Sequence, residues 1–218
     1  MTRDLAGDQA FIRAHTELSV AALVPEFRLW LATEITPIWQ ASEGWLEAEG
    51  VAPPFWAFAW PGSQAIARMV LDDPIHVAGR RVLDFAAGGG LAGMAAARAG
   101  AVDVEAAEID TLAVAAIGLN ALENGVDVRA VFADVVGSAC RWDVILCGDV
   151  CYEGPMTRHI FPWLRQMARA GAEVWIADPG RAYLPVEALV EIGRFCITTT
   201  RELEDREERE TRVFRVSG

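Results

Sequence analysis

A strand, a glycine-rich turn and a helix are expected in succession between residues 80 and 98. The stretch RRVLDFAAGGGLAG begins with the apolar strand formers Val82, Leu83 and Phe85, continues through three consecutive glycines and leads into a helix at residues 91–98. Glycines lack the Cβ atom that would hold a ligand away from the backbone, so the N–H groups at the start of the helix are accessible. This unit predicts a small-molecule site at the end of the strand.

The glycines also match a nucleotide-binding pattern. Gly88, Gly90 and Gly93 satisfy G-x-G-x-x-G, which is weak evidence for a nicotinamide dinucleotide when it stands alone. Asp84 ends the strand and places a carboxylate beside the glycines, which repels a pyrophosphate and suits a ligand with ammonium and sulfonium groups. S-adenosylmethionine is such a ligand, and we favour it over a dinucleotide.

The composition is typical of one globular domain with an extension. With 218 residues, 53% of them hydrophobic, the chain is long enough to bury roughly 70% of its unfolded surface. Its start, MTRDLAGDQA, is too polar for a signal peptide, and no apolar run approaches the ~18 residues of a membrane span. We therefore expect a cytoplasmic protein without a membrane partner.

The charges and the cysteines argue against two further kinds of site. Nucleic-acid binding depends on clustered Lys and Arg, whereas the net charge here is −12 at pH 7, so we expect no nucleic-acid partner and favour a basic protein surface. The cysteines have neither C-x-x-C spacing nor a companion histidine at zinc-finger spacing, which predicts reduced thiols and no metal site. They are Cys140, Cys147, Cys151 and Cys196.

Residues 1–51 are expected to form a helical extension packed on a core domain at 52–218. Helices are predicted at 8–20, with Asp8 as N-cap, and at 40–49, whereas the segment EFRLWLATEIT between them fits either a strand or a short helix. The aromatic stretch PPFWAFAWPG is expected to be a structured loop before a helix at 63–71. It either joins the extension to the core or forms an aromatic wall beside an adenosine or a target side chain.

The core alternates strands and helices. After the first strand, strands are predicted at 102–109, 128–132, 142–147 and 173–177, with helices at 110–123 and 155–170, the second broken early by Pro162. A helix near 186–192 and strands near 195–200 and 211–216 are expected to follow, the strands forming an antiparallel hairpin at the sheet edge. The fold class is therefore α/β, with a Rossmann-like, doubly wound, mostly parallel seven-stranded sheet.

Acidic residues end five consecutive predicted strands: Asp84, Glu108, Asp134, Asp149 and Asp178. The carboxyl ends of strands in an open α/β sheet form its binding crevice. In such a crevice, Glu108 can accept both ribose hydroxyls of an adenosine and Asp134 can accept the adenine amino group. Asp110 stands where an NADP site would need an arginine, which again disfavours a dinucleotide.

The motifs together resemble a known family. The segments DFAAGGG, AEID, VFAD and CGDVCYE resemble the seven-stranded class I methyltransferases, and Asp149 to Tyr152 matches the D-x-x-Y pattern of their protein-lysine branch. The segments PEFRLWLATEITPIW, PPFWAFAWPGSQAIAR, DPGRAYLP and TTRELED are similar to the electron transfer flavoprotein β-subunit lysine methyltransferases. The likeness runs from about Phe11 to the C-terminus. Phe85-Ala86-Ala87 departs from the commoner aliphatic-Gly-Ala-Gly pattern, although Gly88 and Gly90 remain.

The resemblance implies an S-adenosylmethionine-dependent protein-lysine N-methyltransferase that acts on the β-subunit of electron transfer flavoprotein and releases S-adenosylhomocysteine. It implies that Asp149 and Tyr152 face the incoming lysine. The cofactor site that it implies consists of Trp60, Gly62, Asp84, Gly88, Gly90, Glu108, Ile109 and Asp134. The alternatives are a methyltransferase for another protein or a small amine, and a cofactor-binding interaction protein with little activity. The acid-rich stretch at 201–212 is either a solvated turn or a surface that receives a basic segment of the substrate.

Overall fold

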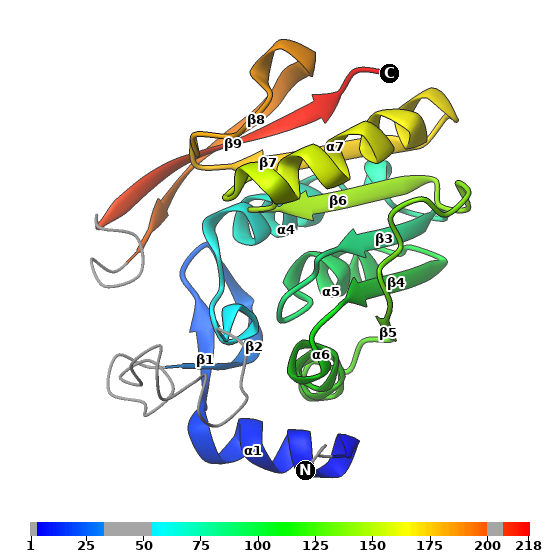
Figure 1. The fold of residues 1–218 in the computed structure, drawn as a ribbon. Helices are drawn as coiled ribbons and strands as arrows, with labels where there is room; N and C mark the ends of the chain where they lie inside the picture. The colour runs from blue at the N-terminus through cyan, green and yellow to red at the C-terminus, as the bar shows by residue number, and fades with distance from the viewer. Residues whose placement is uncertain (1–3, 33–53, 200–206) are drawn as a thin grey trace.

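The core of the protein is one seven-stranded sheet (Figure 1). The computed structural model describes residues 4–32, 54–199 and 207–218. The strands lie in the order β5-β4-β3-β6-β7-β9-β8, and their bounds are β3 (Arg81–Phe85), β4 (Asp103–Glu108), β5 (Arg129–Phe132), β6 (Val144–Gly148), β7 (Glu173–Asp178), β8 (Leu189–Thr198) and β9 (Glu208–Val216). The first five are parallel, and β9 pairs antiparallel with both β7 and β8. The predicted sheet, including its C-terminal antiparallel hairpin, is confirmed.

Helices cover both faces of the sheet, because successive strand residues point to opposite sides. Helices α4 (Pro61–Asp72) and α5 (Leu91–Arg98) bury Ile66 and Met94 in one cluster with Val82 and Trp175. Helix α6 (Thr111–Glu123) packs on β4 and β5, beside α5. Helix α7 (Gly154–Arg169) packs on the opposite face and buries Trp163. The order of the strands reverses between β3 and β6, so the fold has a topological switch point there.

The N-terminal part is a helix followed by a two-stranded ribbon, which corrects the helix predicted at 8–20. Helix α1 (Leu5–His15) begins after the N-cap Asp4, rather than at Asp8, and ends before β1 (Glu17–Ala21). Strand β1 pairs antiparallel with β2 (Val24–Leu31), which also decides that the segment left open is a strand as far as it is described. The predicted helix at 40–49 and the proposed domain boundary near residue 51 lie outside the described residues.

Two further helix predictions are wrong in part. The stretch 186–192 contains only a 3-10 turn, η3 (Val186–Ala188), because the residues from Leu189 onward pair with β9. Pro162 lies inside α7 without ending it, since buried Ile160, Trp163 and Leu164 hold both sides of the proline against the sheet. Conversely, α4 begins two residues before the predicted start, with Pro61 in its first turn, where a missing N–H is tolerated.

Within 4–32, 54–199 and 207–218, no helix is long and apolar enough to cross a membrane. In the same described ranges no group of three or more His, Cys, Asp or Glu residues could hold a metal ion.

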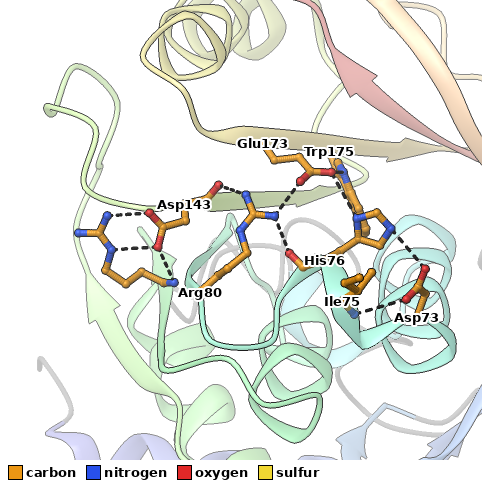
Figure 2. Close-up of polar contacts among 8 residues, drawn as sticks. Asp73, Ile75, His76, Arg80, Asp143, Glu173 and Trp175 are labelled. Carbon is orange, nitrogen blue, oxygen red and sulfur yellow. Dashed lines mark hydrogen bonds and ion pairs between the residues drawn. The ribbon is translucent and has the colours of Figure 1, made fainter.

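A polar network joins the amino ends of β3, β6 and β7 (Figure 2). Arg80 donates hydrogen bonds to Glu173 Oε2 and His76 O, both at 2.8 Å, and to Asp143 O at 2.9 Å. Arg81 pairs with both oxygens of Asp143, at 2.7 and 3.1 Å. This rim is opposite the one on which the glycine turn lies, so the network ties the sheet together away from the predicted site.

The network predicts a pH-dependent contribution to stability. Burial raises the pKa of Glu173, but the hydrogen bonds from Arg80 and Trp175 outweigh it and hold the pKa below its usual range. The stabilisation is therefore complete above the unfolded pKa of about 4.3 and is lost as the pH falls through the lowered value. We expect Arg80→Met to lower the free energy of unfolding by about 2 kcal/mol at pH 7 and by less at pH 3. Urea unfolding at both pH values measures this.

The exposed pair of Arg194 with Glu191 provides a matched control, because Arg194→Met also removes an ion-paired arginine. We expect that variant to have the same stability as the wild type, within the error of the measurement, at either pH. Equal losses for the two variants would contradict the importance of the Arg80 network.

Candidate active site

The turn between β3 and α5 has the backbone conformation that its glycines suggest. Gly88 and Gly90 have φ values of +54° and +81°, and Gly90 is the N-cap of α5. Ala86 also has a positive φ, +52°, at the position where the wider superfamily has glycine. An alanine there carries a steric cost of roughly 1–2 kcal/mol, so this departure from the common pattern preserves the shape of the turn at a loss of stability.

Asp84 lies beneath the turn. Its side chain is 2% exposed, and its Oδ2 accepts a hydrogen bond of 2.7 Å from Gly93 N, in the first turn of α5. Burial raises the pKa of Asp84 to about 8, and nearby Glu108 adds to the rise. A Cβ on Gly93 would lie 3.1 Å from the same carboxylate oxygen, which explains the glycine. The structure thus gives Asp84 a role in holding the turn, while its predicted contact with a cofactor stays a prediction.

Glu108 joins β4 to the glycine turn. Its Oε1 accepts from Gly88 N at 2.7 Å and its Oε2 from Ile109 N at 3.0 Å, and burial raises its pKa. Ile109 is 73% exposed, which is unusual for a large apolar side chain beside a carboxylate. Gly88, Glu108 and Ile109 are therefore brought together, and their contact with an adenosine stays a prediction. Each Glu108 oxygen retains a second lone pair for a ribose hydroxyl.

Asp134 is placed differently from the other predicted cofactor residues. It is exposed, its Oδ1 accepts from Val136 N at 2.9 Å, and its Oδ2 lies 3.4 Å from His159 Nε2. Its interactions are thus those of a residue that caps its own turn. The predicted contact between Asp134 and an adenine amino group stays a prediction.

The start of α4 meets the end of β6. Trp60 is the N-cap of α4, and Gly62 N donates to Asp149 Oδ2 at 2.5 Å. A Cβ on Gly62 would lie 2.5 Å from both that oxygen and Ala177 O, so only glycine fits between the two strand ends. The N-terminus of a helix favours a negative charge, and here it faces a carboxylate.

Asp149 is held through both its backbone and its side chain. It has a left-handed backbone, with φ of +57°, is 7% exposed, and donates its N–H to Ala177 O at 2.9 Å. Its Oδ1 lies 3.1 Å from Arg181 Nη2. Burial raises the pKa of Asp149 to about 7, although Arg181 lowers it and Asp178 raises it. The carboxyl group is therefore poised to change its protonation state near neutral pH.

Tyr152 follows Asp149 in the turn after β6. Its ring is 39% exposed and 5.6 Å from the ring of Phe55, and burial raises its pKa. It lines a cavity of about 280 Å³. The other lining residues are Pro179, Gly180, Arg181, Ala182 and Arg209. Tyr152 is thus placed on the wall of a space large enough for a side chain of a partner.

Both interpretations of the aromatic stretch find support in the structure. Trp56 is buried and packs with Leu112 and Ala116 of α6, which joins the N-terminal part to the core. Phe55 is 48% exposed and lies 6.1 Å from the ring of Trp60, as well as next to Tyr152. One face of the stretch therefore packs in the core and the other lies against Tyr152, while its contact with an adenosine or a target side chain stays a prediction.

The sequence interpretation missed Arg181 and Arg209. Arg181 contacts Asp149, and both arginines line the cavity beside Tyr152. Arg181 follows the turn signal Pro179-Gly180 directly after β7, and this signal could have identified it. Arg209 lies within the acid-rich stretch, whose residues 201–206 are outside the described part of the chain. Within that stretch, Glu210 pairs with Arg194 at 3.1 Å.

Comparison with known proteins decides the family. A family model described as "Methyltransferase small domain" matches residues 59–148. The electron transfer flavoprotein beta subunit lysine methyltransferase of Xenopus laevis is 39% identical over 180 residues, which cover 80% of this chain and 71% of that protein. The chain belongs to this family. The member from Danio rerio is 37% identical over 79% of this chain and 67% of its own length, and that from Homo sapiens is 33% identical over 79% and 66%.

Solved structures with low sequence identity share the fold of this family member. N-methyltransferase NodS from Bradyrhizobium japonicum WM9, in complex with S-adenosyl-L-homocysteine, has a TM-score of 0.52 and 15% identity, covering 70% of this chain and 84% of its own. Thermoplasma acidophilum 1320 has a TM-score of 0.55 and 19% identity, covering 72% and 88%. These likenesses support the Rossmann-like α/β fold, and membership of the family shows that the chain is an S-adenosylmethionine-dependent methyltransferase.

Proposed function

We propose that this methyltransferase modifies a lysine side chain of the β-subunit of electron transfer flavoprotein. The observation that carries the proposal is the Asp149 carboxylate, which is buried at the end of β6, bound by Gly62 N and followed three residues later by Tyr152 on the wall of a cavity. The names of the relatives from Xenopus laevis, Danio rerio and Homo sapiens support the choice of substrate.

The residues around the glycine turn fit S-adenosylmethionine. We propose that Glu108 and Ile109 hold the adenosine and that the turn at Gly88 and Gly90 accommodates the methionine portion, with Trp60, Gly62, Asp84 and Asp134 completing the site. When bound, the cofactor supplies a methyl group on a sulfonium that a neutral amine can attack. The fit is supported by the acidic strand end at Glu108 and by a backbone that approaches a ligand without Cβ atoms.

The protein must also present the lysine as a neutral amine. A free lysine with pKa about 10.4 is neutral in only about one part in 2,500 at pH 7, a cost of ~4.6 kcal/mol. An ionised Asp149 attracts the ammonium form, so we assign it to docking and aiming the lysine rather than to lowering its pKa. Because burial raises the pKa of Asp149 to about 7, its carboxylate is also a better proton acceptor than an exposed aspartate. Tyr152 forms part of the channel wall.

Labelled S-adenosylmethionine tests the substrate. Incubation with purified electron transfer flavoprotein should place label on lysine of its β-subunit, as read by mass spectrometry. Label on other proteins of a cytosolic extract, but not on this subunit, would favour another protein substrate, and label on a free amine alone would favour a small-molecule enzyme.

We further propose that the protein is cytoplasmic and that it is divided into an N-terminal extension at residues 1–51 and a methyltransferase domain at 52–218.

Glu108→Ala tests the cofactor site. Because Glu108 lies against the glycine turn, we expect the variant to bind S-adenosylhomocysteine more weakly by about 1.5–3 kcal/mol, the value of hydrogen bonds to a charged acceptor. Isothermal titration calorimetry measures the change. Glu187→Ala, which removes an exposed acid of η3, should leave the affinity unchanged. An unchanged dissociation constant for Glu108→Ala would remove Glu108 from the site, and comparable affinity for NAD would reject the cofactor.

A further inference from the structure

The loop after β7 brings Arg181 to Asp149. Arg181 Nη2 lies 3.1 Å from Asp149 Oδ1, and the two side chains are 22% and 7% exposed. The Arg181 guanidinium carbon also lies 5.9 Å from the centroid of the Trp60 ring. The guanidinium is therefore held by a carboxylate and an aromatic ring at the predicted methyl-transfer site.

The position of Arg181 is fixed by a buried acid. Asp178 is completely buried, and its Oδ1 accepts from Gly180 N at 2.7 Å and from Arg181 N at 2.6 Å. Gly180 has a φ of +89°, a conformation that glycine adopts without steric cost. The loop is thus folded around Asp178, so the pairing of Arg181 with Asp149 is built into the fold.

Some of the other groups that face Asp149 favour its ionised form, and others oppose it. Asp178 at the end of β7 carries the same charge as an ionised Asp149, and its own pKa is raised by burial. The Cys151 thiol, in the turn after β6, has a pKa raised by burial to about 12 and is neutral. Gly62 N, at the start of α4, and Arg181 are the groups that oppose burial and Asp178.

We propose that Arg181 is a positioning residue for methyl transfer, whose guanidinium keeps the Asp149 carboxylate ionised and oriented so that the ammonium group of the target lysine can dock on it. The inference rests on the proposed function, because it assigns Arg181 to the same site. A protonated aspartic acid attracts no ammonium, so loss of the guanidinium reduces docking wherever Asp149 takes up a proton.

The ratio of kcat/KM in Arg181→Gln to that in the wild type, measured from pH 9 to pH 7, tests this role. The substrate lysine titrates equally in both proteins, so its contribution cancels in the ratio. Arg181→Gln removes the cation beside Asp149, and we expect this to raise the pKa of Asp149 by about 1–1.5. This lies near the low end of the range, roughly 1–3, by which a neighbouring cation lowers the pKa of a carboxyl group. The ionised fraction of the variant then falls earlier as the pH decreases, and we expect the ratio to fall about five- to tenfold.

Two further variants separate this role from a structural one. Arg181→Lys retains a cation, so its ratio to the wild type should be nearly constant over the same pH range. Arg194→Gln removes an equal charge from an exposed ion pair on β8 and should also give a constant ratio. A slope in the Arg194→Gln ratio equal to that of Arg181→Gln would overturn the proposal, because the effect would then reflect net charge alone.

The titration of Asp149 gives a readout that does not depend on methyl transfer. Carboxyl ¹³C NMR of protein labelled at aspartate, with the Asp149 signal identified by its absence in Asp149→Asn, should show a higher titration midpoint in Arg181→Gln than in the wild type. An unchanged midpoint or a constant kcat/KM ratio would overturn the proposal. If no substrate is methylated at all, the proposed function fails, while the midpoint still shows whether Arg181 keeps the Asp149 carboxylate ionised.

Discussion

Asp149→Asn should lower kcat/KM for the protein substrate by at least about 100-fold while leaving the affinity for S-adenosylhomocysteine within about threefold of the wild type. Asparagine keeps an oxygen for Gly62 N, so the start of α4 and the end of β6 stay in place. It removes the charge that docks the lysine ammonium, and a hundredfold loss corresponds to about 2.7 kcal/mol. Steady-state kinetics and calorimetry on the same preparation measure the two quantities.

The stability of Asp149→Asn relative to the wild type checks the raised pKa of Asp149 independently of the kinetics, because the substitution lowers kcat/KM but should increase stability at neutral pH. The pKa of Asp149 is about 7 in the folded protein, whereas an unfolded aspartate titrates near 3.9, so the folded state holds the proton more tightly. This contribution is fully present below pH ~3.9 and is lost as the pH rises through 7. Relative to Asp149→Asn, the wild type should lose about 2–4 kcal/mol of stability between pH 4 and pH 8.

Near wild-type turnover of Asp149→Asn would contradict the docking role of Asp149. A loss of S-adenosylhomocysteine affinity as large as the loss of kcat/KM would contradict it as well.

Gly62→Ala should destabilise the protein by at least about 3 kcal/mol, which corresponds to a decrease in Tm of roughly 6–12 °C for a chain of this length. The added Cβ would lie 2.5 Å from Ala177 O and from Asp149 Oδ2, and the first of these belongs to the backbone of β7. Relief requires movement of α4 away from β6, so methyl transfer should also decrease. Differential scanning calorimetry and the methylation assay test both effects.

Gly118→Ala is the matched control for this substitution. Gly118 lies inside α6, and a Cβ there would meet no atom within 4 Å. Alanine favours a helix over glycine, so this variant should be more stable by about 0.5–1 kcal/mol. A Gly62→Ala protein with the Tm and turnover of the wild type would show that α4 does not pack against Asp149 as described.

The parts of the fold that could be predicted are those with strong local signals. Helix α5 has the predicted bounds, because the glycines define its start and an alanine-rich run follows. Asp110 precedes α6 and its Oδ1 accepts from Leu112 N at 2.9 Å, as an N-cap does. The five parallel strands of the main sheet could be predicted from apolar runs, each of which ends at or near an acid or a glycine.

The errors occur where a distant partner decides the local structure. Leu18 and Ser19 have helical spacing with Phe11 and Ile12, yet they pair with Trp30 and Leu29 of β2. Pairing with a strand that follows later in the chain converts such residues to extended structure regardless of their helical pattern. The start of β8 is a second case, because its partner β9 comes later in the sequence.

The candidate site shows the same division. The acids at the strand ends could be predicted, because the termination of an apolar run marks the position of each. Whether an acid faces the ligand depends on hydrogen bonds that no sequence pattern reports. Asp84 and Asp134 are therefore both predicted to contact the cofactor, although Asp84 is buried and Asp134 is exposed. Arg181 belongs to a loop without periodicity, and its contact with Asp149 spans 32 positions of the chain.

The position of β9 has a consequence for how the chain folds during its synthesis. This strand is the last along the described sequence, yet it lies between β7 and β8 and covers the edge of β7. Until it is made, the backbone of the apolar segment VWIA is an unpaired sheet edge, which other chains can extend. A nascent chain that has not yet reached β9 therefore passes through a stage at which this edge is open to aggregation.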